Sequence, residues 1–145
     1  MKKIILISAV LFAVIAVFAF RTAKTSAPEE ITVNAGDKVE VYYFHLTRRC
    51  VTCQAVENET RNAIQALYPD ELDKGIVSYI VLNLDDEKSQ AAAEKCKATG
   101  QSLLIISGDT RIDLTDKGFM YAKTSPDKLR AEIKKAIDPL LKSLQ

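Results

Sequence analysis

Cys50 and Cys53 are separated by two residues, at the point where a strand-like run gives way to a helix-like one. Residues 39–44 are rich in β-branched and aromatic side chains, which predicts a strand. From residue 50 to 68 apolar side chains recur at helical spacing, which predicts a helix. Cys50 would then lie at the positive end of a helix dipole, near unpaired backbone N–H groups that stabilise a thiolate. Cys53, one turn further on, would resolve a mixed disulfide.

The rest of the pattern alternates strands and helices. Pro69 and Asp70 are expected to end the first helix, and the strand that follows is apolar enough to be covered on both faces. A strand, a helix and a second buried strand imply a parallel pair with a right-handed crossover. The other expected elements are a short strand at 31–33, a strand at 77–84, a helix at 89–98 ended by Gly100, hairpin strands at 103–106 and 110–114, and a closing helix that starts at Ser125 and is kinked or ended at Pro139.

The first twenty residues have the features of an export signal. Lys2 and Lys3 precede an unbroken apolar run at 4–20, which predicts a signal peptide cleaved after Ala19 or an uncleaved membrane anchor. Residues 21–37 are expected to form a tether and a short first strand, and residues 38–145 one domain. We therefore expect an exported protein, periplasmic or anchored facing the periplasm, that contacts the membrane only through an uncleaved N-terminal segment.

Charge and cysteine content narrow the function classes. The formal charge is +1, and two positive charges lie in the leader, so the remainder carries −1. A near-neutral domain without a basic stripe has no electrostatic reason to bind nucleic acid.

Outside the cytosol close cysteines tend to be oxidised, so Cys50 and Cys53 are the expected disulfide. Cys96 is then left over, either as a small buried helix residue or as a third thiol that attacks that disulfide.

Several stretches follow one another in a definite order. They are Tyr42-Tyr43-Phe44-His45, Cys50-Val51-Thr52-Cys53, Val81-Leu82-Asn83-Leu84-Asp85, Ser102-Leu103-Leu104-Ile105-Ile106, the turn Gly108-Asp109 and the closing helix. In this order they resemble the thioredoxin superfamily over residues 38–144. The tyrosine-rich strand, His45 and Arg49 more narrowly resemble small exported bacterial proteins of the ArsF (nitroreductase-subunit) type. The resemblance implies a thioredoxin-like three-layer α/β/α sandwich with a central mixed sheet of four to five strands.

The chain also departs from the thioredoxin pattern. Arg49 stands where thioredoxins have tryptophan, and Val51-Thr52 replaces Gly-Pro between the cysteines. The family's buried carboxylate and lysine correspond to positions near Phe44 and Val81, so that pair is missing. The family's cis-proline corresponds to about Gln101, beside Ser102. In the family this proline helps to present backbone to the substrate and keeps metal away from the thiols, and this chain lacks it at that position.

The expected function is thiol–disulfide exchange with protein or small thiol and disulfide partners. Cys50 and Cys53 are the expected catalytic pair, and Arg48 and Arg49 either tune Cys50 or form a solvated rim. His45 is either a base for Cys53 or a plain loop residue. No cofactor is implied, because the electrons reside in the cysteine pair.

The alternative is a non-enzymatic subunit or binding module of the same fold, with a structural disulfide or a metal-binding cysteine pair. Structural zinc would need four ligands, and only Cys50, Cys53, Cys96 and His45 are candidates. Their spacing does not favour a metal site.

Overall fold

The computed structural model describes residues 38–144, so the expected leader at 1–20 and the tether and strand at 21–37 lie outside the described residues. The described part contains four strands and five helices. Their bounds are β1 Val39–His45, α2 Val51–Leu67, α3 Pro69–Asp73, β2 Val77–Asn83, α4 Glu87–Lys95, β3 Ser102–Ser107, β4 Thr110–Asp113, α5 Thr115–Tyr121 and α6 Pro126–Ser143. None of these helices is long and apolar enough to cross a membrane.

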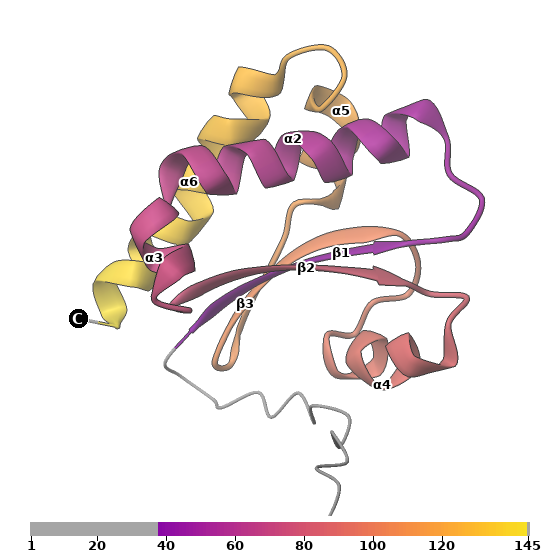
Figure 1. The fold of residues 1–145 in the computed structure, drawn as a ribbon, viewed down its shortest axis with the longest axis horizontal. Coiled ribbons are helices and arrows are strands. Elements are labelled where there is room, and N and C mark those ends of the chain that lie inside the picture. The colour runs from indigo at the N-terminus through magenta and orange to yellow at the C-terminus, as the bar shows by residue number, and fades with distance from the viewer. Residues whose placement is uncertain (1–37, 145) are drawn as a thin grey trace, which may run out of the picture. The chain divides into compact units, whose positions relative to one another are not determined.

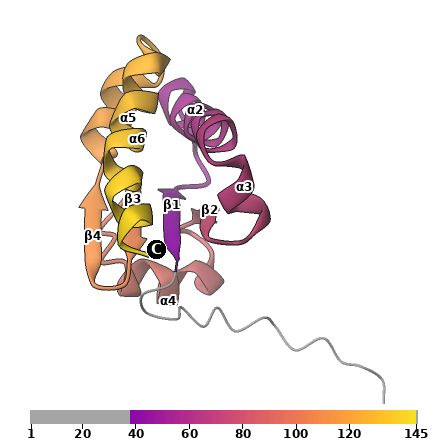
Figure 2. The same cartoon turned by 90° about the vertical axis from the view of Figure 1, so that its left-hand side faces the viewer.

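The strands form one mixed sheet in the order β2-β1-β3-β4. β1 and β2 are parallel, β3 runs antiparallel to β1, and β4 runs antiparallel to β3. Helices α2, α5 and α6 cover one face and α4 covers the other, as Figures 1 and 2 show. The expected fold class, an α/β sandwich of the thioredoxin-like type, is confirmed.

Alternate residues of β1 feed two separate cores, because successive side chains of a strand point to opposite faces. Val39, Val41 and Tyr43 pack beneath α2 and α6 in the larger core. Tyr42 and Phe44 pack with α4 in the smaller one. All five side chains are almost completely buried, so β1 is the central strand that joins the two layers.

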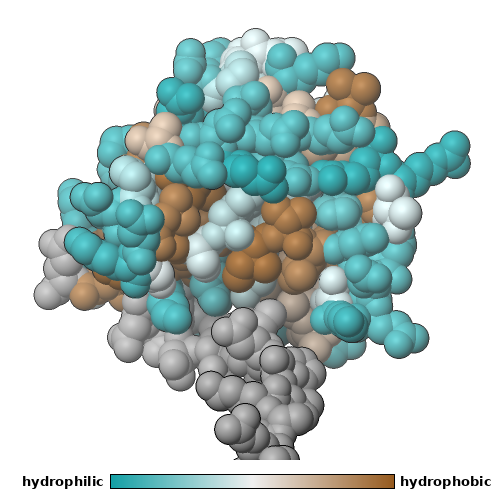
Figure 3. Space-filling model, viewed as in Figure 1, coloured by the Kyte–Doolittle hydropathy of each residue, from teal (hydrophilic) through white to brown (hydrophobic). Residues whose placement is uncertain are grey.

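The prediction that the strand after the first helix is covered on both faces is confirmed in part: Tyr79 and Val81 pack against the larger core and Ile80 and Leu82 against the smaller one, but all four are only partly buried. β2 is an edge strand within the described residues, and only Val77 at its start is fully buried. Its run of apolar residues packs partly under helices on each face, and no other strand among residues 38–144 pairs with its outer edge. Figure 3 shows apolar surface between the polar surfaces of α2 and α4, over β2.

Two helix ends differ from expectation because of local backbone geometry. Pro69 does not only end a helix; it opens α3 at the first helical position, where its missing N–H costs nothing. α4 ends at Lys95 rather than at Gly100, and Lys97 takes the left-handed conformation with φ 53°. A lysine therefore occupies the position that glycine usually fills after a helix.

The C-terminal part holds one unpredicted helix and one that does not end at its internal proline. α5 was missed because it is short and contains Gly118, a poor helix former. A side chain at Gly118 would meet Val56 Cγ1 at 3.2 Å and Leu103 Cδ2 at 3.3 Å, so glycine lets α5 approach α2 closely. α6 begins after Ser125 as expected, but it continues through Pro139 to Ser143.

Candidate functional site

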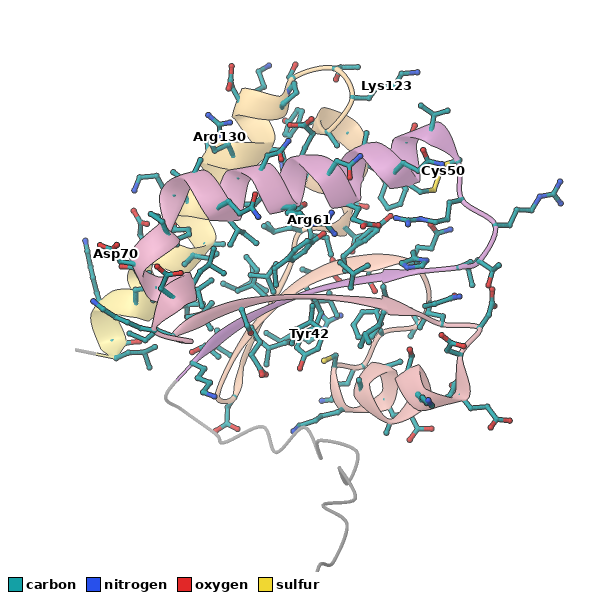
Figure 4. All side chains as sticks on the ribbon, viewed as in Figure 1. Tyr42, Cys50, Arg61, Asp70, Lys123 and Arg130 are labelled. Carbon is teal, nitrogen blue, oxygen red and sulfur yellow. A yellow bond between two sulfur atoms is a disulfide. The ribbon has the colours of Figure 1, made fainter. Side chains whose placement is uncertain are left out.

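Cys50 is the N-cap residue of α2 and forms a disulfide with Cys53. The two Cα atoms are 5.1 Å apart. Cys50 Sγ accepts a hydrogen bond from the Cys53 backbone N–H at 3.2 Å, in the way that a serine oxygen caps a helix. Figure 4 shows Cys50 at the start of α2, at the surface of the molecule.

The two cysteines differ sharply in exposure. Cys50 is exposed, whereas Cys53 is only 3% exposed. The first turn of α2 contains no acidic residue, so no carboxylate there offsets the positive end of the helix dipole. A thiolate on Cys50 would therefore meet an N–H donor, a helix dipole and solvent, and an attacking sulfur would reach Cys50 before Cys53.

The loop that leads to Cys50 is tied to the loop after β2. Thr47 donates its backbone N–H to Asp85 Oδ2 at 2.8 Å, and Asn83 Nδ2 donates to Thr47 Oγ1 at 2.9 Å. The N–H of Leu84 donates to the His45 carbonyl at 2.7 Å. The bond from Thr47 also lowers the pKa of the Asp85 carboxyl.

The chain leaves β1 towards one face of the sheet and β2 towards the other. The loop at 46–50 therefore lies at a switch point of the topology, where open α/β sheets bind ligands.

The two arginines before Cys50 have different surroundings. Arg48 is exposed and takes part in none of the ion pairs among residues 38–144. Arg49 folds back along α2, forms an ion pair with Glu57, and lies 6.0 Å from the centroid of the Tyr43 ring. Its Nε is buried without a hydrogen-bond partner in the same region.

Glu57 is partly buried, unlike most glutamates on a helix surface. Its side chain is only 14% exposed because it turns toward Arg49 and Arg61. Arg61 donates to Glu57 Oε1 at 2.9 Å, and Figure 4 shows Arg61 below α2, on its sheet side. Burial raises the pKa of Glu57, but the hydrogen bonds and charges of Arg49 and Arg61 outweigh burial and leave that pKa lowered. Glu57 therefore carries a negative charge at neutral pH.

Two tyrosines of the sheet donate to carbonyl groups of α2. Tyr43 Oη donates to the Cys53 carbonyl at 2.9 Å, and Tyr79 Oη donates to the Glu57 carbonyl at 3.0 Å. Burial raises the pKa of both phenols, and nearby arginines partly oppose the effect. Both hydroxyls thus stay protonated and anchor the first two turns of the helix to the sheet.

His45 lies beside this group without touching the sulfurs. Its Nδ1 is 2.9 Å from the Leu46 carbonyl oxygen, and its ring centroid is 6.1 Å from that of Tyr43. No hydrogen bond within residues 38–144 joins His45 to Cys50 or Cys53. A role for His45 as a base remains a prediction.

Gln101 and Ser102 lie at the same end of the sheet as the cysteine pair. β3 begins at Ser102 opposite Phe44, and the described chain contains no cis peptide bond. Ser102 Oγ donates to the Gly100 carbonyl at 2.8 Å. Gln101 Oε1 is buried with no partner in the described part, beside a surface pocket of about 330 Å³ that Arg111 also lines.

Cys96 is a free, buried thiol on the other face of the sheet. It packs with Tyr42 and Phe44 beneath α4, whereas α2 carries Cys53 on the opposite face. Burial raises the pKa of the Cys96 thiol, which makes it a poor nucleophile. Its expected place as a small buried residue at the end of a helix is confirmed. No cluster of three or more His, Cys, Asp or Glu side chains within residues 38–144 is arranged to hold a metal ion.

Comparisons with known proteins identify no family. No protein-family model matches the chain, and no curated protein matches it. A solved chain described as "Structure of a malarial protein" is 21% identical, with 68% of this chain and 96% of that chain covered and a TM-score of 0.42. A likeness at this level says nothing of function, which has to be argued from the residues.

Proposed function

We propose that the chain is an exported thiol–disulfide oxidoreductase whose redox pair is Cys50 and Cys53. The observation that supports it is the contrast between the two sulfurs: Cys50 is exposed at a helix N-cap, and Cys53 is buried one turn behind it. A disulfide that only stabilised the fold would have no need of one open sulfur next to a helix dipole. The apolar leader at residues 4–20 supports an exported location.

The exchange proceeds in two steps. A thiolate of a reduced partner attacks Cys50 Sγ, a mixed disulfide forms, and Cys53 leaves as the thiolate and takes up a proton. A second thiolate of the partner then attacks its own sulfur in the mixed disulfide and releases Cys50. Two electrons pass from the partner to the protein, the partner becomes a disulfide, and the reverse sequence oxidises the protein again.

The test is a redox titration of the purified protein in glutathione buffers, with free thiols trapped by a maleimide mass tag. We expect one reversible two-electron couple, with Cys50 alkylated faster than Cys53. A Cys53→Ala variant should accumulate a mixed disulfide with glutathione on Cys50. A Cys96→Ser variant is the matched control and should leave the couple unchanged. A disulfide that stays oxidised under strong reductant in the folded protein, or a couple that needs Cys96, would overturn the proposal.

A further inference from the structure

We propose that Glu57 sets the reduction potential of the cysteine pair by neutralising Arg49. The proposal rests on the function proposed above and adds a positioning residue to the same site. Glu57 touches neither sulfur in the described contacts and acts through the guanidinium of Arg49, the residue that directly precedes Cys50. Without this carboxylate, Arg49 would stabilise the Cys50 thiolate more strongly, and the pair would be a stronger oxidant.

The ion pair is well placed to act on Cys50. Arg49 is its chain neighbour, and its guanidinium lies over the ring of Tyr43. The hydroxyl of that same ring donates to the Cys53 carbonyl at 2.9 Å. Arg49 is therefore adjacent to Cys50 in the chain, and it lies over the ring of Tyr43, whose hydroxyl is hydrogen-bonded to Cys53.

Partial burial makes these charges effective. The side chains of Arg49 and Glu57 are 23% and 14% exposed, so water and salt screen them less than a surface pair. Glu57 also lies four residues after Cys53, which places both on the same side of α2. The network of Arg49, Glu57 and Arg61 carries one net positive charge, and loss of Glu57 would leave two.

The direction of the effect follows from which redox state is charged. A positive charge near Cys50 favours its thiolate, which exists only in the reduced protein, and so raises the reduction potential. Glu57→Gln removes the neutralising charge and should raise the potential, and Arg49→Gln should lower it. A unit charge roughly 10 Å away in a half-buried site changes the redox equilibrium constant about threefold to tenfold, which is about 15–30 mV for a two-electron couple.

The experiment measures the reduction potential of the full chain in glutathione buffers and the pH dependence of Cys50 alkylation. The variants are Glu57→Gln, Arg49→Gln and Arg49→Lys. Glu59→Gln is the matched control, because it removes the same charge from the same helix about 200° around its axis. Circular dichroism verifies the fold of each variant, and Arg49→Gln alone still tests the sign if Glu57→Gln does not fold.

Shifts of opposite sign support the inference: Glu57→Gln should raise the potential and lower the Cys50 thiol pKa, and Arg49→Gln should do the reverse. Arg49→Lys should stay near wild type, since it keeps the charge. A purely structural ion pair would destabilise both variants without moving their potentials apart, and that result would overturn the inference. So would an equal shift in Glu59→Gln. The absence of any reversible couple in the wild-type protein would instead overturn the proposed function, and this inference with it.

Discussion

Replacing Lys97 with glycine should stabilise the protein. Lys97 lies two residues after Lys95, the last residue of α4, and has φ 53°, a conformation in which a side chain crowds the backbone. Two backbone hydrogen bonds at the C-terminal end of α4 hold this geometry. Ala98 N–H donates to the Ala93 carbonyl at 2.8 Å, and Lys97 N–H donates to the Glu94 carbonyl at 3.0 Å. Glycine can make the same bonds without a Cβ.

The size of the gain is the difference between two effects. The left-handed conformation costs a lysine about 1–2 kcal/mol, and glycine avoids that cost. Glycine also gives the unfolded chain more conformational entropy, which lowers the free energy of unfolding by about 0.5–1 kcal/mol. Lys97 is exposed, so little packing is lost. The net gain is about 0.5–1 kcal/mol, which for a domain of this size raises Tm by about 2–6 °C.

Thermal and urea unfolding of the oxidised protein measure this gain. Lys95→Gly is the matched control, because Lys95 is also exposed but lies within α4 in the right-handed conformation. Glycine there should cost about 1 kcal/mol. If Lys97→Gly lowered the free energy of unfolding as Lys95→Gly does, the left-handed helix end would be refuted.

Two further substitutions test contacts around α2. Tyr43→Phe removes the donor to the Cys53 carbonyl from a fully buried side chain and should lower the free energy of unfolding by about 1 kcal/mol in urea; no loss would contradict the hydrogen bond. The pKa of Asp138 is lowered by hydrogen bonds from Lys134 and Tyr68, so its contribution to stability is present above its unfolded pKa of about 3.9 and is lost as the pH falls through the lower native value. Asp138→Asn should therefore lower Tm more at neutral pH than at acid pH when Tm is measured across pH, and an equal loss at all pH values would contradict the ion pair.

Those parts of the fold that depend on local pattern were predictable from the sequence. The β-branched and aromatic run at 39–45, the apolar run of β3 and the turn at Gly108 each bias the backbone directly. Sheet order is not a local property, so the apolar run of β2 gave no sign that it would lie at an edge. α5 carries neither a clear apolar period nor a good helix-forming sequence, and its place depends on contact of Gly118 with Val56.

The candidate site divides in the same way. The spacing of Cys50 and Cys53 after a strand was enough to place them at a helix start. The role of Glu57 was missed, because a glutamate in a helix is normally solvated and its two arginine partners lie at different distances along the chain. The four-residue spacing of Glu57 and Arg61 was the available signal, since such pairs face each other on a helix.

The two edge strands of the sheet formed by residues 38–144, β2 and β4, have unequal protection against association between molecules. β4 carries Arg111 and Asp113, and charged side chains discourage strand-to-strand pairing with a second molecule. β2 carries no charged residue over Val77–Asn83, and its sequence has the β-propensity and low charge of segments that stack into fibrils. In partly unfolded protein, association is therefore expected to begin along β2. A single lysine introduced on the solvent side of β2 should be enough to discourage it.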